Sequence, residues 1–381
     1  MKLELTEEQQ MIQALAREFA EKEVQPVAGR LDQEARFPHE TVKRMGELGF
    51  LGIAVPEAYG GAGADPVAYV LALEEIAKVC ASHAVIMSVN NSLYCDPVLK
   101  YGTEDQRRKF LTPFASGQKI GCFALTEPQA GSDASNQHTL AVPDGSRYVL
   151  NGRKAFVTNG REAAAALVVA QTDAAKGRHG ISAFLVEKGT PGFLVPKVED
   201  KLGIRASDTA EFVFEDCRVP AENRLGSEGM GFKIAMSSLD GGRIGIAAQA
   251  LGIAAGAFER SVAYAKERKA FGVPIGQHQM VQWMLADMAT AIDAARLLVW
   301  RAATLKGAGQ PFGVEASMAK LFASEMAMKV TTDAIQVHGG YGYIKEFQVE
   351  RYFRDAKITQ IYEGTSQIQK LVIARHLLGT Q

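Results

Sequence analysis

The apolar residues in the first third of the chain recur at helical intervals. Met11, Leu15 and Phe19 are each four residues apart, and similar spacings continue to about residue 117. Side chains three or four positions apart lie on one face of a helix, so this region is predicted to be helical. Thr6 and Gln9 have the spacing of a capping box, which predicts a helix start at Thr6.

The middle of the chain, from about residue 122 to 226, changes to short runs rich in β-branched and aromatic residues. Turn residues separate these runs, which are 147–150, 155–158, 166–169, 182–186 and 211–214. Asn151 and Gly152 lie between two of them and tolerate the positive φ of a type I′ turn, so they predict a hairpin. We expect a compact antiparallel barrel or sandwich in this region.

Long helical stretches return after Gly231. Three Ala-rich segments are too long for strands and rich in helix formers, namely 243–268, 278–306 and 314–337. The chain is also longer than a typical single domain. The sequence therefore predicts an α+β fold of three domains: an N-terminal helical domain (1–120), a middle β domain (121–228) and a C-terminal domain like a four-helix bundle (229–381).

Composition excludes several classes of function. The formal net charge of −1 over 381 residues argues against a nucleic-acid-binding protein, which needs a concentrated basic surface. No run of about 18 uncharged apolar residues occurs, so no membrane span is expected. The four cysteines are scattered without a CxxC pair, which favours packing roles in a reducing compartment, and we expect no metal site.

The N-terminal segment 1–10 is acidic, unlike a secretory signal or an Arg-rich transit peptide. We therefore expect the first domain to start here and the protein to be cytoplasmic. A mature mitochondrial matrix protein is the alternative.

Near the C-terminus, Glu363 stands just before a predicted helix start. Ser366 and Gln369 have capping-box spacing, so a helix cap alone explains the segment. A carboxylate beside residues that suit a buried pocket is also a candidate general base. The spacing by itself leaves both interpretations open.

Two segments in the middle region could hold a planar, phosphorylated ligand. The loop from Leu125 to Asp133 has small residues and backbone N–H groups that a ligand can approach closely. Phe156 and Thr158 are two residues apart and so share one face of a strand, where a ring could stack and a hydroxyl could bind. A capped loop and ordinary strand alternation explain the same residues without a ligand.

Three further segments lie in the helical C-terminal region. Gly339, Gly340 and Gly342 bare the backbone after a long helix, although a helix C-cap needs only one glycine. No strand precedes them, so they are not a Rossmann fingerprint. Asp240 and Arg243 are predicted near a helix N-terminus, where an anion can be held. Other basic residues, including Arg268, are explained equally well as solvated helix faces.

Together, these segments resemble those of the acyl-CoA dehydrogenase family over essentially the whole chain. The resemblance implies FAD as the cofactor, an acyl-CoA substrate, and Glu363 as the base that removes the α proton. It assigns to FAD a set of residues spread over the middle and C-terminal regions: Phe123, Leu125, Thr126, Ser132, Phe156, Thr158, Arg268, Phe271, Gln279, Gln336, Gly339, Gly340, Thr365 and Gln367. It assigns to the substrate Ser132, Asp240, Arg243, Tyr362 and Gly364.

The resemblance also implies an assembly and a reaction. In this family a neighbouring subunit supplies residues such as Arg268 to the FAD diphosphate, within a homotetramer built as a dimer of dimers. The implied reaction is α,β-dehydrogenation of a saturated acyl-CoA to the trans-2-enoyl-CoA, with the β hydride passing to flavin N5. Electrons then pass to an electron-transferring flavoprotein. Because a free carboxylate has a pKa near 4.3, the site must raise the pKa of Glu363 by burial.

Within the family, the segments around Arg243 and Glu363 look most like short-chain (butyryl-CoA) members. Relatives that act on certain branched acyl groups carry their base immediately before this Arg, where this chain has Gly242. Medium-chain and short branched substrates remain alternatives, as do an acyl-CoA oxidase, a flavin monooxygenase or nitroalkane oxidase, and a non-catalytic scaffold. The chain departs from the usual pattern at Asn136, His138 and Ala270.

Overall fold

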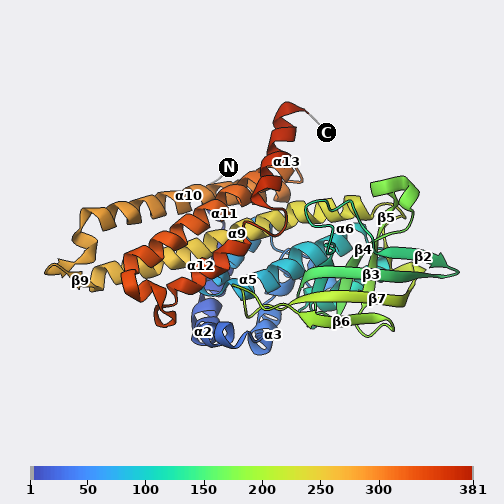
Figure 1. Ribbon diagram of the computed structural model, residues 1–381, viewed down its shortest axis with the longest axis horizontal. Coiled ribbons are helices and arrows are strands. Elements are labelled where there is room, and N and C mark those ends of the chain that lie inside the picture. Colours follow the sequence, from blue (N-terminus) through green and yellow to red (C-terminus); the bar gives the residue numbers. More distant parts are fainter. Residues whose placement is uncertain (1–3, 380–381) are drawn as a thin grey trace.

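The computed structural model describes residues 4–379 and divides along its long axis into helices and a sheet. Figure 1 shows the sheet at one end and the long C-terminal helices extending to the other, with the N-terminal helices between and below them. The predicted α+β fold class, helical then β then helical, is confirmed. The N-terminal positions 1–3, part of the acidic segment discussed above, lie outside the described residues.

The N-terminal region is helical, as its spacing predicts. Thr6 caps the first helix, and the predicted capping box is present: Gln9 N–H donates to Thr6 Oγ1 (3.2 Å) and Thr6 N–H donates to Gln9 Oε1 (3.0 Å). π-Helical segments, 20–24 and 89–95, interrupt the helices. The α-helices are α1 (Glu7–Phe19), α2 (Gln25–Glu34), α3 (His39–Glu47), α4 (Pro66–Val79), α5 (Ala81–Ser88), α6 (Asp96–Tyr101), α7 (Glu104–Phe110) and α8 (Thr112–Ala115).

The middle region forms one sheet in the order β6-β7-β3-β2-β4-β5-β8, with β1 paired to β4. Most pairs are antiparallel, as expected, but β1 and β2 run parallel to β4, so the sheet is mixed rather than purely antiparallel. Its strands are β1 (Gly121–Ala124), β2 (Leu140–Asp144), β3 (Arg147–Thr158), β4 (Ala165–Gln171), β5 (Ile181–Glu187), β6 (Phe193–Val198), β7 (Thr209–Pro220) and β8 (Arg224–Leu225).

The hairpin predicted at Asn151 and Gly152 is wrong. Both residues lie inside the continuous strand β3, where the pairing with β7 shifts register. Asn151 is bound there by its side chain, since its Oδ1 accepts from the Asp216 N–H (2.8 Å) and its Nδ2 donates to Asp216 Oδ1 (3.1 Å). Gly152 has φ +148°, and a Cβ at this position would lie 2.6 Å from Thr139 Cα. The Asn-Gly pair therefore marks a β-bulge instead of a turn.

The C-terminal region is built around one very long helix. Helix α9 (Gly231–Glu267) has 37 residues and packs against α4, α10 and α11. It is rich in Ala and Gly and buried on most sides, as expected for a helix at the centre of a bundle. The remaining elements are the short strands β9 (Lys269–Ala270) and β10 (Val273–Pro274), followed by α10 (Gln279–Gly307), α11 (Gly313–His338), α12 (Val349–Ile358) and α13 (Ser366–Leu378).

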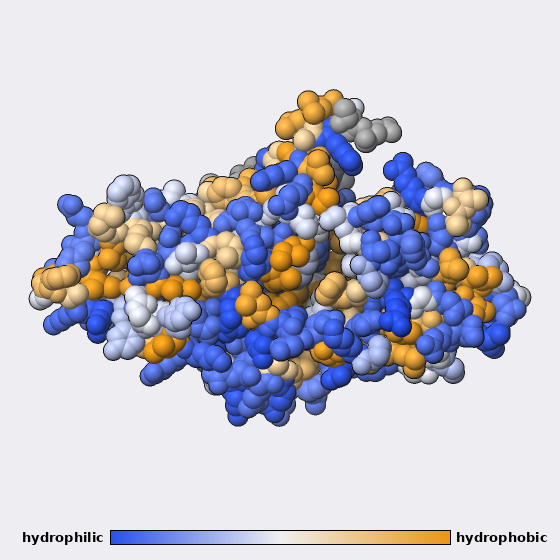
Figure 2. Space-filling model, in the orientation of Figure 1, coloured by the Kyte–Doolittle hydropathy of each residue, from blue (hydrophilic) through white to orange (hydrophobic). Residues whose placement is uncertain are grey.

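The helical core is continuous from the N-terminal to the C-terminal helices. One cluster joins residues of α1 and α4, such as Phe19 and Leu73, to residues of α9 and α11, such as Leu251 and Ala319. The sheet has a core of its own. Hydrophilic residues cover most of the face in Figure 2, and apolar side chains gather along the C-terminal helices and at the centre of that face. No helix in the described residues is long and apolar enough to cross a membrane.

Candidate active site

One cavity brings together residues from all three regions of the fold. Its volume is about 190 Å³, and it lies where the N-terminal helices, the sheet and the C-terminal helices meet. The predicted site residues that line it are Phe123, Leu125, Thr126, Ser132, Phe156, Thr158, Arg243, Tyr362, Glu363 and Gly364. The proposed base and most of the proposed substrate residues therefore face the same space as the middle-region loop and strand.

Glu363 combines a strained backbone with an unpartnered carboxylate. Its φ is +52°, a left-handed conformation that costs a non-glycine residue about 1–2 kcal/mol. Gln369 Nε2 holds this turn by donating to the carbonyl oxygens of Glu363 (3.1 Å) and Gly364 (2.9 Å). The carboxylate oxygen Oε2 is buried without a hydrogen-bond partner. Burial raises the pKa of Glu363 to about 8, although Lys320 and Arg243 act in the opposite direction.

The helix after the base begins one residue earlier than the predicted capping box requires. Thr365 is the N-cap of α13, and its hydroxyl accepts from the Ile368 N–H (3.3 Å). Ser366 is the first helical residue and instead donates to Glu325 (2.7 Å). The predicted cap at Ser366 is wrong because Gly364, at φ +92°, turns the chain so that Thr365 takes the extended conformation of an N-cap.

Gly242 on α9 provides the space that the carboxylate occupies. A Cβ built at this position would overlap Glu363 Oε2 and lie 2.8 Å from Glu363 Cδ and 2.9 Å from Leu93 Cδ2. A side chain at position 242 would therefore point into the place where the base now sits. In this geometry positions 242 and 363 reach the same point of the cavity from two different segments.

The loop that contains Leu125 and Thr126 is fixed by a buried ion pair. Lys154 Nζ donates to Glu127 Oε1 (2.7 Å), to Gln137 Oε1 (2.5 Å) and to the carbonyl oxygen of Leu125 (3.1 Å). Burial alone would raise the pKa of Glu127, but the neighbouring ammonium of Lys154 outweighs this and lowers the pKa. Burial lowers the pKa of Lys154 to about 8. These contacts determine the path of the loop along the cavity.

Phe156 stands out on the strand that faces this loop. The pairing of β3 with β7 shifts register between Lys154 and Val157. Within this irregularity Phe156 takes φ +56° and is 67% exposed. A large apolar side chain held exposed on a strained backbone is costly unless something packs on it. Because Phe156 and Thr158 both line the cavity, this face suits a planar ring with polar edges.

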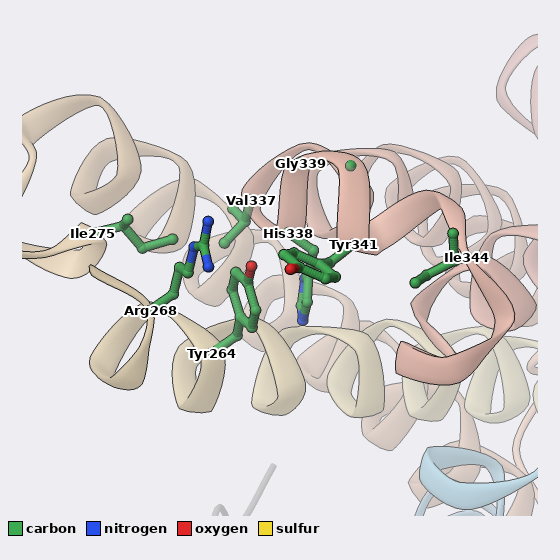
Figure 3. Close-up of a pocket in the computed structure, with 9 residues that line it drawn as sticks. Tyr264, Arg268, Ile275, Val337, His338, Gly339, Tyr341 and Ile344 are labelled. Atoms are coloured by element: carbon green, nitrogen blue, oxygen red, sulfur yellow. The ribbon is translucent and has the colours of Figure 1, made fainter. Parts of the chain in front are cut away.

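Other predicted site residues form a second group, at the far end of α9. Arg268, Gly339 and Gly340 line a separate pocket with Tyr264 and Tyr341 (Figure 3). The Arg268 guanidinium lies 5.3 Å from the centre of the Tyr341 ring. No atom lies within 4 Å of a Cβ built on Gly339 or Gly340, so their backbone is open to a ligand.

The two groups are far apart within one chain. Arg243 and Arg268 are 25 residues apart along α9 and its C-cap, which corresponds to about 37 Å at 1.5 Å per residue. Phe271 is also distant: it is 95% exposed with φ +53°, next to the short β9 strand. Gln279 is the first residue of α10. The residues predicted to hold one cofactor are therefore divided between two separate places on the chain.

The remaining predicted residues do not line the main cavity in the described part of the chain. Asp240 instead pairs with Arg243 (Nη1–Oδ1, 2.7 Å). Both residues lie in the third and fourth turns of α9, because this helix starts at Gly231 rather than just before Asp240, so the predicted helix N-terminus is wrong. Gln336 lies on α11, Thr365 caps α13 and Gln367 is exposed.

Sequence reasoning missed the wall of the cavity and the residues that support its base. Val85, Val89 and Leu93 line the cavity from α5 and the π-helical segment that follows. Their four-residue spacing is visible in the sequence, but it is the same as that of ordinary core residues. Lys320, which also holds the turn at Glu363, has no signal of its own because its contact with Gly364 depends on tertiary folding. Gln369 is only five residues from Gly364, but its spacing predicts a capping box and not the hydrogen bonds that hold the turn.

A helix–sheet–helix fold whose cavity is lined by both a buried carboxylate and an exposed aromatic side chain fits the class of flavin-dependent oxidoreductases. The chain belongs to the acyl-CoA dehydrogenase family. Family models match in order along the chain: "Acyl-CoA dehydrogenase, N-terminal domain" over residues 6–118, the middle domain over 122–217 and the C-terminal domain over 229–378.

Individual relatives agree with this assignment. The mitochondrial short-chain specific acyl-CoA dehydrogenase of Mus musculus is 57% identical, with 99% of this chain and 91% of the relative covered. The solved butyryl-CoA dehydrogenase of Megasphaera elsdenii is 50% identical, with a TM-score of 0.98 and 99% and 100% covered. A chain in the structure described for the electron transferring flavoprotein of Acidaminococcus fermentans is 54% identical, with a TM-score of 0.98 and the same coverage.

The cofactor of this family is FAD, and the residues around the cavity fit it. Phe156 offers an exposed ring face, the loop at Leu125 and Thr126 is fixed at the edge of the cavity, and Glu363 Oε2 is buried without a partner. The protein is therefore an FAD-dependent acyl-CoA dehydrogenase.

Proposed function

We propose that this protein oxidises short-chain acyl-CoA thioesters, with butyryl-CoA as the preferred substrate class, and that Glu363 is the base. The observation that carries the proposal is the buried, unpartnered carboxylate of Glu363 in the cavity beside Phe156 and Thr158. The names of the short-chain and butyryl-CoA relatives support the chain length.

Glu363 acts in its ionised form. Its carboxylate accepts the proton from the carbon next to the thioester carbonyl, and its raised pKa makes it a stronger base than an exposed glutamate. The left-handed turn at Glu363 and the space left by Gly242 direct the carboxylate into the cavity. FAD, when bound, supplies the acceptor for the hydride that leaves the β carbon.

The apolar wall of the cavity supports the short-chain preference. Val85, Val89 and Leu93 close the side that faces the helical core. We propose that an acyl chain lies against these three side chains and that they limit its length. Ser132, Tyr362 and Gly364 also line the cavity and are proposed to contact the thioester end of the substrate.

The active site is proposed to be shared between two subunits. The separation of about 37 Å along α9 between Arg243 and Arg268 supports this arrangement. In it, Arg268, Phe271 and Gln279 of one copy hold the diphosphate and adenosine of the FAD whose flavin lies beside Glu363 of the other. Gln336, Gly339, Gly340, Thr365 and Gln367 complete the proposed cofactor set, within a homotetramer.

Mixed assemblies test the sharing. Glu363→Gln and Arg268→Ala chains are each expected to be inactive alone. Refolded or coexpressed together, they should regain activity, because some sites then combine an intact Glu363 with an intact Arg268 from the other chain. If the mixture stays as inactive as its parents while mixed assemblies form, both residues act within one chain.

Electron-transferring flavoprotein is the proposed acceptor. The support is the family relationship and the similarity to the chain in the structure described for such a flavoprotein. Reduction of purified electron-transferring flavoprotein by the enzyme and butyryl-CoA without oxygen tests it. A cytoplasmic location is proposed from the four cysteines, which are all buried and free.

Anaerobic titration with acyl-CoAs of graded length tests the reaction and its chain length together. The flavin absorbance band of the holoenzyme should bleach most strongly with butyryl-CoA and should not bleach with any acyl-CoA in Glu363→Gln. Bleaching that is strongest with a medium or branched chain would contradict the short-chain proposal. Bound flavin that no acyl-CoA reduces would contradict the substrate class.

A further inference from the structure

We propose that Lys320 is a positioning residue for the base: it fixes the turn at Glu363 and its ammonium favours the ionised carboxylate. This inference deepens the proposed function and rests on Glu363 being the base. It assigns a role to a lysine on α11 that lies outside the lining of the cavity.

Lys320 is fully buried, which is unusual for lysine. Its exposed fraction is 0%, and its Nζ donates a hydrogen bond of 2.7 Å to the carbonyl oxygen of Gly364, the residue after the base. A buried ammonium is costly unless other groups compensate for the lost water. The carbonyl of Gly364 partly replaces the water that the buried ammonium has lost. Since Gly364 directly follows Glu363, this carbonyl belongs to the turn that carries the base.

The hydrogen bond acts on a backbone that needs support. Glu363 has φ +52° and Gly364 φ +92°, so two successive residues take the left-handed region. Such strain persists only where surrounding contacts over-determine it. Lys320 from α11 and Gln369 from α13 both donate to the Gly364 carbonyl, so side chains of two helices hold this peptide.

The charge of Lys320 acts on the carboxylate as well. Burial lowers the pKa of Lys320 to about 8, while Glu363 opposes that shift, and Lys320 in turn opposes the rise in the pKa of Glu363. No side-chain hydrogen bond joins the two, so the carboxylate stays free to accept a proton. The other charged groups that act on this pair are Arg243 from α9 and Glu325 from α11. Tyr69 from α4 and Tyr362 also lie near the base: burial raises the pKa of each, and the charge of Glu363 acts in the same direction.

Two effects of removing Lys320 can therefore be separated. Loss of the positive charge should raise the pKa of Glu363 further, so proton abstraction needs a higher pH. Loss of the hydrogen bond should lower the rate even where Glu363 is fully ionised. Gln369→Leu removes donors to the same turn without changing a charge, so it should produce only the second effect.

The experiment follows proton abstraction without turnover. In a β-thia acyl-CoA a sulfur atom without hydrogen replaces the β carbon. Holoenzyme in deuterated water can therefore exchange the α proton of this compound but cannot oxidise the compound. Exchange is measured by mass spectrometry from pH 6 to 10 for the wild type, Lys320→Met, Lys320→Arg and Gln369→Leu. Lys329→Met is the control, because it also removes one positive charge from α11 but Lys329 is exposed and paired with Asp333.

Lys320→Met should shift the half-maximal pH upward by about one unit, which lowers the exchange rate at pH 7 about tenfold because only the ionised base reacts. Lys320→Arg keeps the positive charge, so its half-maximal pH should return most of the way to that of the wild type. Lys329→Met should leave the profile unchanged. If Lys320→Met does not fold, Lys320→Gln keeps an N–H donor without the charge and should show the same shift.

A folded Lys320→Met or Lys320→Gln enzyme with the wild-type profile would overturn the inference. So would an equal shift in Lys329→Met. Absence of exchange in the wild type would instead count against the proposed function. Exchange in the wild type but not in Glu363→Gln keeps the base assignment separate from the role of Lys320.

Discussion

Replacing Gly242 by alanine should displace the base while leaving the fold intact. The added Cβ would lie 2.8 Å from Glu363 Cδ and overlap Oε2, whereas ordinary contact begins near 3.4 Å. The carboxylate oxygen must therefore move by more than about 1 Å, since the added Cβ would also lie 2.9 Å from Leu93 Cδ2 and cannot itself turn away. Misplacement by about 1 Å can cost on the order of 100-fold in rate, so we expect kcat to fall about 100-fold or more.

Unfolding should not account for this loss. Gly242 lies inside α9, where alanine is favoured over glycine by about 1 kcal/mol in helix propensity. Gly241→Ala is the matched control, because its Cβ would meet only the flexible end of Lys306, at 3.1 Å. That variant should keep its flavin and nearly wild-type kcat.

The assay is steady-state oxidation of butyryl-CoA with an artificial electron acceptor, together with the flavin content and the Tm of each variant. Gly242→Ala with bound flavin, an unchanged Tm and kcat within threefold of the wild type would refute the reasoning. The carboxylate could then occupy another productive position, and the space at Gly242 would not determine where the base lies.

Three further predictions concern the base and the middle region. The raised pKa of Glu363 disfavours its ionised form in the folded protein, so kcat/KM should rise with pH through about 8. For the same reason Glu363→Gln should have a higher Tm than the wild type at pH 9, and this difference in Tm should shrink toward pH 5. Equal Tm values at pH 9 would contradict the raised pKa. Gly152→Ala should lower the free energy of unfolding in urea by roughly 3 kcal/mol, because of its φ and the close Thr139 backbone. Gly145→Ala is the control, since Gly145 has φ +59° but open space around it, and should lower that free energy by about 1 kcal/mol. Equal losses would count against the bulge argument. Lys154→Met should cost about 3–5 kcal/mol in the same assay because it leaves a buried carboxylate unpaired, and a loss below about 1 kcal/mol would show that the ion pair is not needed.

The order of elements was predictable because hydrophobic spacing is local. The capping box at Thr6 and the long helices after Gly231 depend on residues within a few turns of one another, so the sequence contains what is needed. The hairpin at Asn151 failed for a different reason. The preference of Asn-Gly for a turn is real, but the hydrogen bonds of the Asn151 side chain to Asp216 and the pairing with β7 stabilise a bulge in its place.

The site was predictable only as a set of segments. Resemblance identified Glu363, and the structure adds the neighbours that the base depends on. Gly242 and Lys320 are 121 and 43 positions upstream of it, and neither has a local pattern that distinguishes it from a packing glycine or a helix-surface lysine. Contacts of this kind exist only after α9, α11 and the final turn come together.

Helix α9 also has a consequence for how the protein gains and loses its cofactor. Its fourth turn contributes Arg243 to one cavity, and Arg268, which caps its C-terminal end, lines the second pocket. If each FAD spans two chains in this way, cofactor binding and subunit association are thermodynamically linked. Added FAD should then lower the protein concentration at which the assembly dissociates, and dilution of the holoenzyme should release flavin and subunits together.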